Sequence, residues 1–178
     1  MANFNLALSK VLSHEGGYVN DPDDLGGETY KGIARNSHGS WPGWKIIDQS
    51  RKDKSFPVNL ADNVNLQQSV KQFYFKTFWQ PLKADQIQNQ TSSESVFDFA
   101  VNSGIATSIR LVQSIVGTKI NGIMGEQTLN KINSIDFGYF QAVFTVSKID
   151  HYMAIIKKRP LNKKYLYGWI IRALSFND

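Results

Sequence analysis

The sequence predicts a mainly α-helical, single compact protein, and three observations support that fold class. Apolar residues recur at helical spacing in successive segments along the 178 residues. Hydrophobic residues make up 42% of the chain and charged residues 20%, which is the composition of a globular protein. A chain of this length can bury roughly two-thirds of its unfolded surface. We expect at most a small β-hairpin, near residues 30–34.

A short amphipathic helix opens the chain and ends on a carboxylate. Its apolar stripe is formed by Phe4, Leu8, Val11 and Leu12, and either Asn3 or Asn5 can cap its start. Glu15 follows on the side of this stripe, and Gly16-Gly17 stops the helix. A carboxyl group held against apolar surface loses hydration, so we expect a raised pKa, as a general acid needs. The alternative is an ordinary solvated residue at a helix end.

The loop that follows, residues 16–32, carries further acids between two glycine pairs. Asp21-Pro22-Asp23-Asp24 is a turn signature, and Gly26-Gly27 permits a second reversal. Such a reversal returns Asp24 and Thr29 toward Glu15. This set can protonate a glycosidic oxygen while the other groups stabilise an oxocarbenium ion or hold a water molecule. For Asp21 and Asp23, bonding to turn amides is the favoured interpretation.

These motifs resemble a known enzyme family. The matching residues are Glu15-Gly16-Gly17-Tyr18, Asp21-Pro22, Asp24, Gly26-Gly27, Thr29 and Gly32-Ile33. They are similar to the phage and prophage N-acetylmuramidases of glycoside hydrolase family 108, also labelled secretion-activator proteins. The resemblance implies a lysozyme-like fold that cuts peptidoglycan, with Glu15 as catalytic acid and Asp24 and Thr29 matching an Asp and a Thr of the family pattern. The Asp-to-Thr gap is one residue shorter than in phage lysozymes generally.

Residues 35–62 are expected to form an irregular connection. Trp41 and Trp44 within it either stack on sugars or attach the loop to the core by burial. Tyr18, Tyr30, Trp44 and Asn102 are the candidate substrate-binding residues. A helix is expected from Asn63, capped by Asp62 or Asn63.

The polar connector Lys83–Gln90 divides the chain into expected lobes, a muramidase lobe at 1–90 and a helical lobe at 91–178. We expect Ser92-Ser93 to cap a buried helix over residues 96–102. On it, Asp98 is expected to bond neighbouring backbone, whereas Asn102 either does the same or faces the substrate groove. Further helices are predicted around residues 109–116, 140–149 and 165–173. The segment Asn121–Leu129 resembles the turn-helix repeat of peptidoglycan-binding modules.

The net charge of +5 and the pI near 9.3 suit an anionic partner, whether nucleic acid, anionic lipid or cell wall. Seven basic residues gather near the C-terminus: Lys148, Lys157, Lys158, Arg159, Lys163, Lys164 and Arg172. They form either a solvated face or an attachment to an anionic wall. A DNA-binding helix-turn-helix does not explain the acid-rich loop, because its carboxylates would repel phosphate.

Other chemistries lack their motifs. There is no Cys, no Gly-x-Ser-x-Gly elbow, no phosphate-binding loop and no zinc helix, and the three His are isolated in sequence. We therefore expect no metal and no organic cofactor. No apolar run approaches the roughly 18 residues of a membrane span, so stable membrane insertion is not expected.

The predicted reaction is hydrolysis of the β-1,4 bond between N-acetylmuramic acid and N-acetylglucosamine by a monomer. The predicted partner is the peptidoglycan glycan strand. The N-terminus lacks a signal peptide, so we expect synthesis in the cytoplasm and action in the periplasm or at the wall, after lysis or passage through a holin or exporter. Two alternatives remain open: a lytic transglycosylase, and a non-catalytic wall-binding or secretion-accessory protein.

Overall fold

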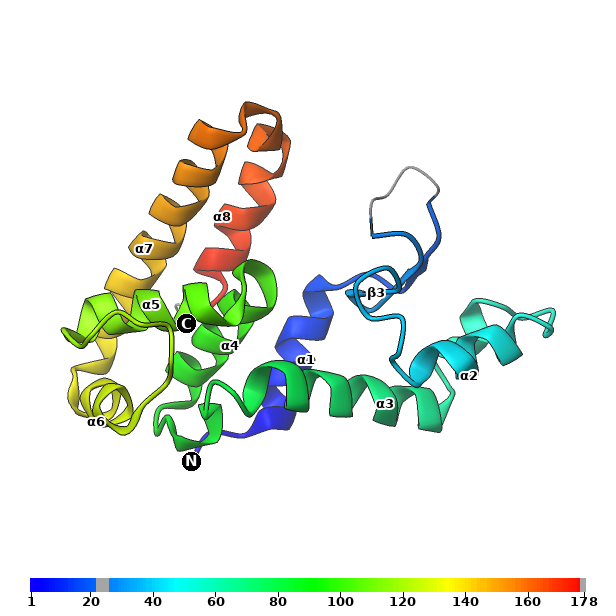
Figure 1. Cartoon of the computed structure of the whole chain (residues 1–178), viewed down its shortest axis with the longest axis horizontal. Coiled ribbons are helices and arrows are strands. Elements are labelled where there is room, and N and C mark those ends of the chain that lie inside the picture. Colours follow the sequence, from blue (N-terminus) through cyan, green and yellow to red (C-terminus); the bar gives the residue numbers. More distant parts are fainter. Residues whose placement is uncertain (22–25, 177–178) are drawn as a thin grey trace. The chain divides into compact units, whose positions relative to one another are not determined.

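The computed structural model describes residues 1–21 and 26–176, and these residues are mostly helical and include one small sheet (Figure 1). The α-helices are α1 (Phe4–His14), α2 (Gly43–Ser50), α3 (Val64–Tyr74), α4 (Gln90–Ser103), α5 (Ile105–Val116), α6 (Glu126–Ser134), α7 (Phe137–Lys158) and α8 (Leu166–Leu174). The strands are β1 (Tyr18–Val19), β2 (Thr29–Tyr30) and β3 (Ile33–Ala34). Short helical turns are η1 (Val58–Leu60), η2 (Phe75–Trp79), η3 (Ala84–Gln86) and η4 (Pro160–Tyr165). The predicted mainly helical fold with a small hairpin is confirmed.

The chain forms two compact units. We call Leu8–Thr77 the hairpin unit, and Met1–Ala7 together with Phe78–Asp178 the helical unit. The lobes expected from the sequence, 1–90 and 91–178, stay a prediction. Among the described helices, none is both long enough and apolar enough to cross a bilayer.

In the hairpin unit, α2 and α3 pack together beside the sheet. The side chains of Val11, Ile33, Ile47, Leu60 and Leu66 are fully buried and form the core of this unit. The expected irregular connection over residues 35–62 is wrong, because α2 lies within it. Pro42, the residue before α2, already has a helical φ of −58°, a value that the proline ring fixes.

The helical unit is built around α4, whose residues 92–100 are all buried, so the expected buried helix is confirmed. The two faces of α4 present aromatic rings to different neighbours. Phe97 lies 5.4 Å from Trp79, and Phe99 lies 5.8 Å from Phe144 on α7. The predicted Ser92-Ser93 cap is wrong. Asn89 caps α4, because its side chain accepts a hydrogen bond from the Ser92 amide at 2.8 Å.

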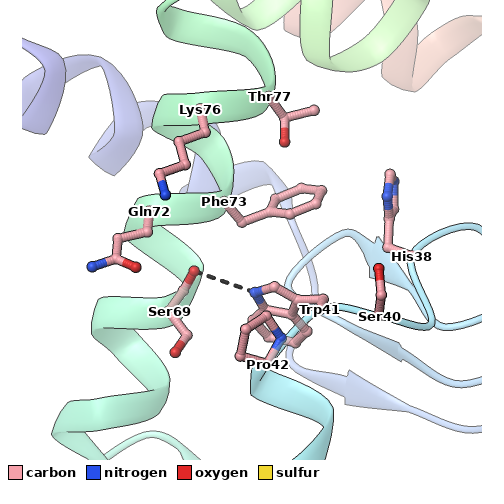
Figure 2. Close-up of a pocket in the computed structure, with 9 residues that line it drawn as sticks. All are labelled: His38, Ser40, Trp41, Pro42, Ser69, Gln72, Phe73, Lys76 and Thr77. Atoms are coloured by element: carbon pink, nitrogen blue, oxygen red, sulfur yellow. Dashed lines mark hydrogen bonds between the residues drawn. The ribbon is translucent and has the colours of Figure 1, made fainter.

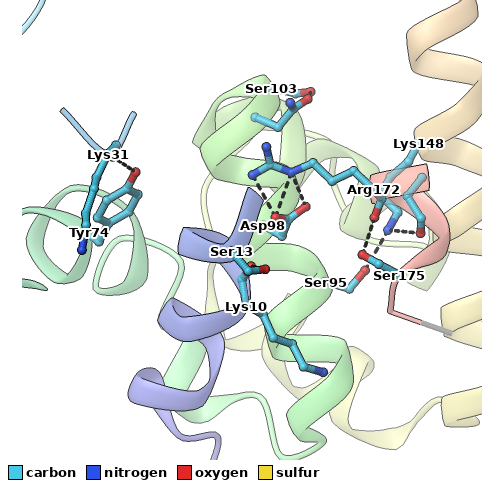
Figure 3. Close-up of polar contacts among 12 residues, drawn as sticks. Lys10, Ser13, Lys31, Tyr74, Ser95, Asp98, Ser103, Lys148, Arg172 and Ser175 are labelled. Carbon is cyan, nitrogen blue, oxygen red and sulfur yellow. Dashed lines mark hydrogen bonds and ion pairs between the residues drawn. The ribbon is translucent and has the colours of Figure 1, made fainter. Parts of the chain in front are cut away.

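Two of the seven C-terminal basic residues turn inward and hold α7 and α8 against α4 (Figure 3). The Arg172 guanidinium binds the buried Asp98 carboxylate, with Nε 3.0 Å from Oδ1. The expectation that Asp98 bonds neighbouring backbone is therefore wrong, because its carboxylate binds a side chain of another helix. Lys148, only 1% exposed, donates to Ser95 Oγ and to the Ala173 carbonyl, both at 3.0 Å. We call Asp98, Lys148 and Arg172 the inner ion cluster.

The expected turn before α6 is confirmed at Asn121-Gly122. Gly122 has a φ of 75°, and its amide donates to the Gln113 side chain at 2.9 Å. The same Gln113 donates from Nε2 to Asn121 Oδ1 at 2.8 Å, which ties the turn to α5. The buried Gln113 side chain therefore holds this exposed turn against α5 within the helical unit.

Candidate active site

The three strands form an antiparallel sheet whose tight turn lies at Lys31-Gly32. Tyr18 pairs with Tyr30, and Tyr30 pairs with Ile33. Lys31 and Gly32 have φ values of 45° and 76°, the two positive values that a two-residue type I′ hairpin requires. Glycine adopts such a φ at little cost, which explains its presence at position 32.

Glu15 lies immediately after the last residue of α1, and its carboxylate reaches the hairpin turn. Its amide donates to the Leu12 carbonyl at 3.3 Å, continuing the last turn of the helix. Two residues later the Gly17 carbonyl accepts from the Lys31 amide at 3.2 Å, which brings the chain back to the hairpin. A Cβ at Gly32 would lie 2.7 Å from Glu15 Oε2. Only a residue without a side chain lets the half-buried carboxylate lie here.

Tyr74 brings α3 to the same point. Its buried hydroxyl donates to the Lys31 carbonyl at 2.7 Å (Figure 3). That hydroxyl would be 2.8 Å from a Cβ at Gly32, so it borders the same small space as the Glu15 carboxylate. Residues from the end of α1, from the hairpin turn and from α3 therefore meet around Gly32. We call Glu15, Gly32 and Tyr74 the turn cluster.

Gln67, about two helical turns before Tyr74 on α3, fixes the rest of the hairpin. It accepts from Lys31 Nζ at 2.6 Å and donates from Nε2 to Tyr30 Oη at 2.9 Å and to the Leu60 carbonyl at 2.7 Å. Burial lowers the pKa of Lys31 and raises the pKa of Tyr30. Tyr30 is only 2% exposed, so its ring packs in the core.

A second acid of the loop, Glu28, was missed by the sequence analysis. It is only 8% exposed and forms ion pairs with Arg35, at 2.8 Å from Nε, and with Arg51. Arg35 also binds Asp48 at 2.7 Å, and this hydrogen bond lowers the pKa of the Asp48 carboxyl. The alternation of side chains along a strand could have revealed Glu28. It stands two residues before the core residue Tyr30, so an extended chain directs both side chains to the same, inner face.

The other predicted site residues lie in different surroundings. Thr29 pairs with Val19 and Ala34 in the sheet, and its hydroxyl donates to the Gly27 carbonyl at 3.3 Å. The ring of Tyr18 lies edge-on to Phe56 at 4.8 Å. Asp24 lies outside the described residues.

Trp44 and Asn102 complete the predicted set. Trp44 is 3% exposed, and the Arg35 guanidinium carbon lies 4.5 Å from the centroid of the Trp44 ring. Trp44 therefore attaches its segment of the chain to the core by burial. Asn102 is half-buried on α4 in the helical unit and accepts from Ser103 Oγ at 3.1 Å. Contact of these residues with substrate stays a prediction.

A half-open cavity of about 320 Å³ lies between α3 and the loop before α2 (Figure 2). Figure 2 shows the Phe73 ring directed into it from α3, facing His38, with the two rings 4.8 Å apart. Trp41 forms its floor and donates from Nε1 to the Ser69 carbonyl at 3.3 Å. Gln72 and Lys76 add polar groups to the wall. The cavity joins an aromatic surface to hydrogen-bonding groups, as small polar ligands require.

Comparison with known families gives two matches, one after the other along the chain. Residues 8–104, more than half of the chain, match the family described as Glycosyl hydrolase 108. The chain belongs to this family. It is therefore a glycoside hydrolase by family, and the resemblance inferred from the motifs is confirmed. Residues 107–174 of this family 108 protein match a second family, described as Predicted Peptidoglycan domain.

One solved structure is similar over nearly the whole chain. "Structure of Brucella abortus SagA" matches with a TM-score of 0.65 and 23% sequence identity, covering 98% of this chain and 95% of that one. This similarity shows a shared fold over residues of both units. No curated protein matches this family 108 chain.

Among residues 1–21 and 26–176, no group of three or more His, Asp or Glu is arranged to hold a metal ion.

Proposed function

We propose that this glycoside hydrolase cleaves the β-1,4 bond between N-acetylmuramic acid and N-acetylglucosamine in peptidoglycan, with Glu15 as the general acid. The family match supports glycan hydrolysis, and the match of residues 107–174 supports peptidoglycan as its target. The observation that carries the role of Glu15 is its contact with the hairpin turn, where a Cβ at Gly32 would approach Oε2 to 2.7 Å.

The proposed chemistry needs one proton donor and one water molecule. The Glu15 carboxyl group donates its proton to the glycosidic oxygen, the bond from that oxygen to C1 breaks, and the leaving sugar departs as an alcohol. Water then adds its oxygen to C1 and releases a proton to a carboxylate, giving a reducing end. Glu15 is half-buried, so its carboxylate is held by its neighbours and still reaches solvent.

Asp24 and Thr29 are proposed helpers in this reaction. Asp24 orients the water or stabilises the positive charge that develops at C1. The short β2 strand, which includes Thr29, pairs with β1 directly after Gly17. Thr29 therefore belongs to the strand that leads into the hairpin turn containing Gly32. We propose that Tyr18 and Asn102 contact the glycan.

The protein is proposed to act as a monomer at the cell wall or in the periplasm, reached by lysis or through a holin or exporter. The second family match supports action at the wall.

Glu15→Gln tests the catalytic role. It keeps the shape of the side chain and removes its transferable proton, so release of reducing ends from purified peptidoglycan should fall by roughly 10²–10⁴-fold. Asp21→Asn is the matched control, because it neutralises an exposed carboxylate of the same loop. Circular dichroism and thermal unfolding should be unchanged in both variants. Undiminished activity of a folded Glu15→Gln variant would remove Glu15 from the mechanism.

Analysis of the released fragments separates the two remaining alternatives. A lytic transglycosylase also works from one Glu but ends in an anhydro sugar, because no water attacks. Mass spectrometry of the muropeptides therefore distinguishes it from a hydrolase. A non-catalytic wall-binding protein would pellet with purified sacculi and release no reducing ends.

A further inference from the structure

The turn between α7 and α8 carries a cluster of positive charge. In Figure 1 these two helices form a hairpin whose far end is closed by η4. We call residues 157–167, at the end of this pair of helices, the hairpin tip. It belongs to the helical unit and is distinct from the β-hairpin of the hairpin unit. Its cations are Lys157, Lys158, Arg159, Lys163 and Lys164, and the sequence has no Asp or Glu from residue 151 to residue 177.

All five cations of the hairpin tip are exposed. Within the part of the chain that the structure describes, none of them forms an ion pair with an acid. By contrast, Lys148 and Arg172 of the same helices are bound inside the inner ion cluster. The positive charge of the hairpin tip is thus available to an external anion, and its field is strongest at low salt.

Apolar side chains are exposed among and beside these cations. Leu161 is 89% exposed at the centre of the tip, and Tyr167 is 78% exposed at the start of α8. Ile171 and Leu174 continue from Tyr167 at helical spacing and are 49% and 45% exposed. A row of apolar residues therefore runs along the outer face of α8 from the basic tip.

Attachment of α8 to the helical unit does not require this outer row. Its inner face provides that attachment through Trp169, whose ring stacks on Tyr152 at 5.1 Å, and through Ala173, which is fully buried. α8 is thus apolar on two faces, and only one of them packs against the protein. In the described part of the chain the outer face is left exposed. An exposed apolar face of this kind is characteristic of an interaction surface.

We propose that the hairpin tip and the outer row of α8 dock on the surface of an anionic lipid bilayer. Five cations attract an anionic headgroup layer, and their long stems let the ammonium groups remain at that layer. Leu161, Tyr167 and Ile171 then enter the boundary between headgroups and acyl chains, where tyrosine is favoured. A glycan strand supplies carboxylates but no apolar phase, so it leaves the exposed leucine and isoleucine unburied. Docking of this kind is peripheral and holds the enzyme beside the membrane.

Co-sedimentation with vesicles tests the proposal on the full chain. Two compositions are compared, phosphatidylcholine alone and phosphatidylcholine mixed with phosphatidylglycerol. We expect binding to the mixed vesicles that is about tenfold or more stronger than to phosphatidylcholine alone and that weakens with added salt. The charge variant combines Lys158→Gln, Lys163→Gln and Lys164→Gln, and the apolar variant combines Leu161→Ser and Tyr167→Ser. Each should reduce binding to mixed vesicles by about tenfold or more.

Matched controls separate the local surface from overall charge and hydrophobicity. Lys45→Gln, Lys52→Gln and Lys54→Gln remove the same charge from exposed sites of the hairpin unit, and Ile123→Ser removes an apolar side chain that is 67% exposed. Both should bind as the parent protein does.

Three results would overturn the proposal. The first is no binding of the parent chain to vesicles, and the second is a loss of vesicle binding in the control variants equal to that in the charge and apolar variants. The third is weaker binding of the charge and apolar variants to purified sacculi while their vesicle binding is unchanged. The last result would make the hairpin tip a wall-binding surface. These outcomes do not depend on whether Glu15 is catalytic.

Discussion

The turn cluster and the inner ion cluster show two ways in which this protein holds a carboxylate. Asp98 is only 2% exposed and binds a guanidinium from another helix. Glu15 is half-buried and lies against the backbone of a glycine turn. A buried charge needs a partner of opposite sign, and that partner also occupies its lone pairs. The Glu15 carboxylate stays partly exposed beside the glycine, so the second arrangement suits chemistry and the first suits stability.

The largest expected effect is on activity, from adding a methyl group to the turn cluster. Gly32→Ala puts a Cβ 2.7 Å from Glu15 Oε2, so the carboxylate must shift and glycan cleavage should fall by about 10²-fold. Gly117→Ala is the control, because Gly117 also has a positive φ, of 69°, with nothing within 4 Å of its added Cβ. Gly117→Ala should lose stability from backbone strain alone, and Gly32→Ala should lose at least as much, measured by thermal unfolding. Equal activity in the two would show that the contact with Glu15 is unimportant.

Breaking the inner ion cluster should cost stability but not specific activity. Asp98→Asn leaves the Arg172 guanidinium half-buried without its charge partner, and the free energy of unfolding should fall by about 3–5 kcal/mol. Asp48→Asn breaks an ion pair of Arg35 whose acid is 49% exposed, and it should cost about 1 kcal/mol or less. Urea unfolding measures both. Similar losses in the two variants would contradict the distinction between buried and exposed pairs.

The pH dependence of stability should report Lys148. Burial lowers its pKa from 10.5 to about 8, although the nearby Asp98 opposes the shift. Between these pH values the unfolded chain holds a proton that the folded chain has released. The free energy of unfolding therefore increases as the pH rises through this range. The gain from this group is at most about 3 kcal/mol. Lys148→Met should remove it. Urea unfolding curves of the two proteins, compared below and inside this pH window, should diverge, and parallel curves would contradict the prediction.

The smallest expected effect comes from the hydroxyl that borders Glu15. Tyr74→Phe removes the hydrogen bond to the Lys31 carbonyl and should lower stability by about 1 kcal/mol. Activity should fall less than in Gly32→Ala, since no atom is added beside the carboxylate. Tyr139→Phe, at a site 56% exposed, is the control and should change neither quantity. If Tyr74→Phe behaved like Tyr139→Phe, the hydroxyl would have no part in holding the turn.

Much of the candidate site could be predicted because its signals are local. The spacing of Phe4, Leu8 and Val11 predicts α1, and Gly16-Gly17 predicts its end directly after Glu15. Gly32 encodes the left-handed hairpin turn. Asn63 caps α3 with its own side chain, which accepts a hydrogen bond from the Leu66 amide at 3.0 Å. Each of these features depends on a few neighbouring residues.

What the tertiary structure alone decided is the pairing of distant charges and the burial of aromatic rings. Nothing near Asp98 in the sequence indicates that its partner stands 74 positions later, and nothing near Lys148 shows that it points inward while Lys158 stays exposed. Trp41 and Trp44 were candidates for stacking on sugars or for attachment to the core, and packing buried both. The sequence by itself determined the family, the helices other than α2, and the position of Glu15 at the end of α1, because helix caps and turns are short-range. The surroundings of each charged or aromatic side chain depend on segments brought together by folding, so only the folded chain could decide them.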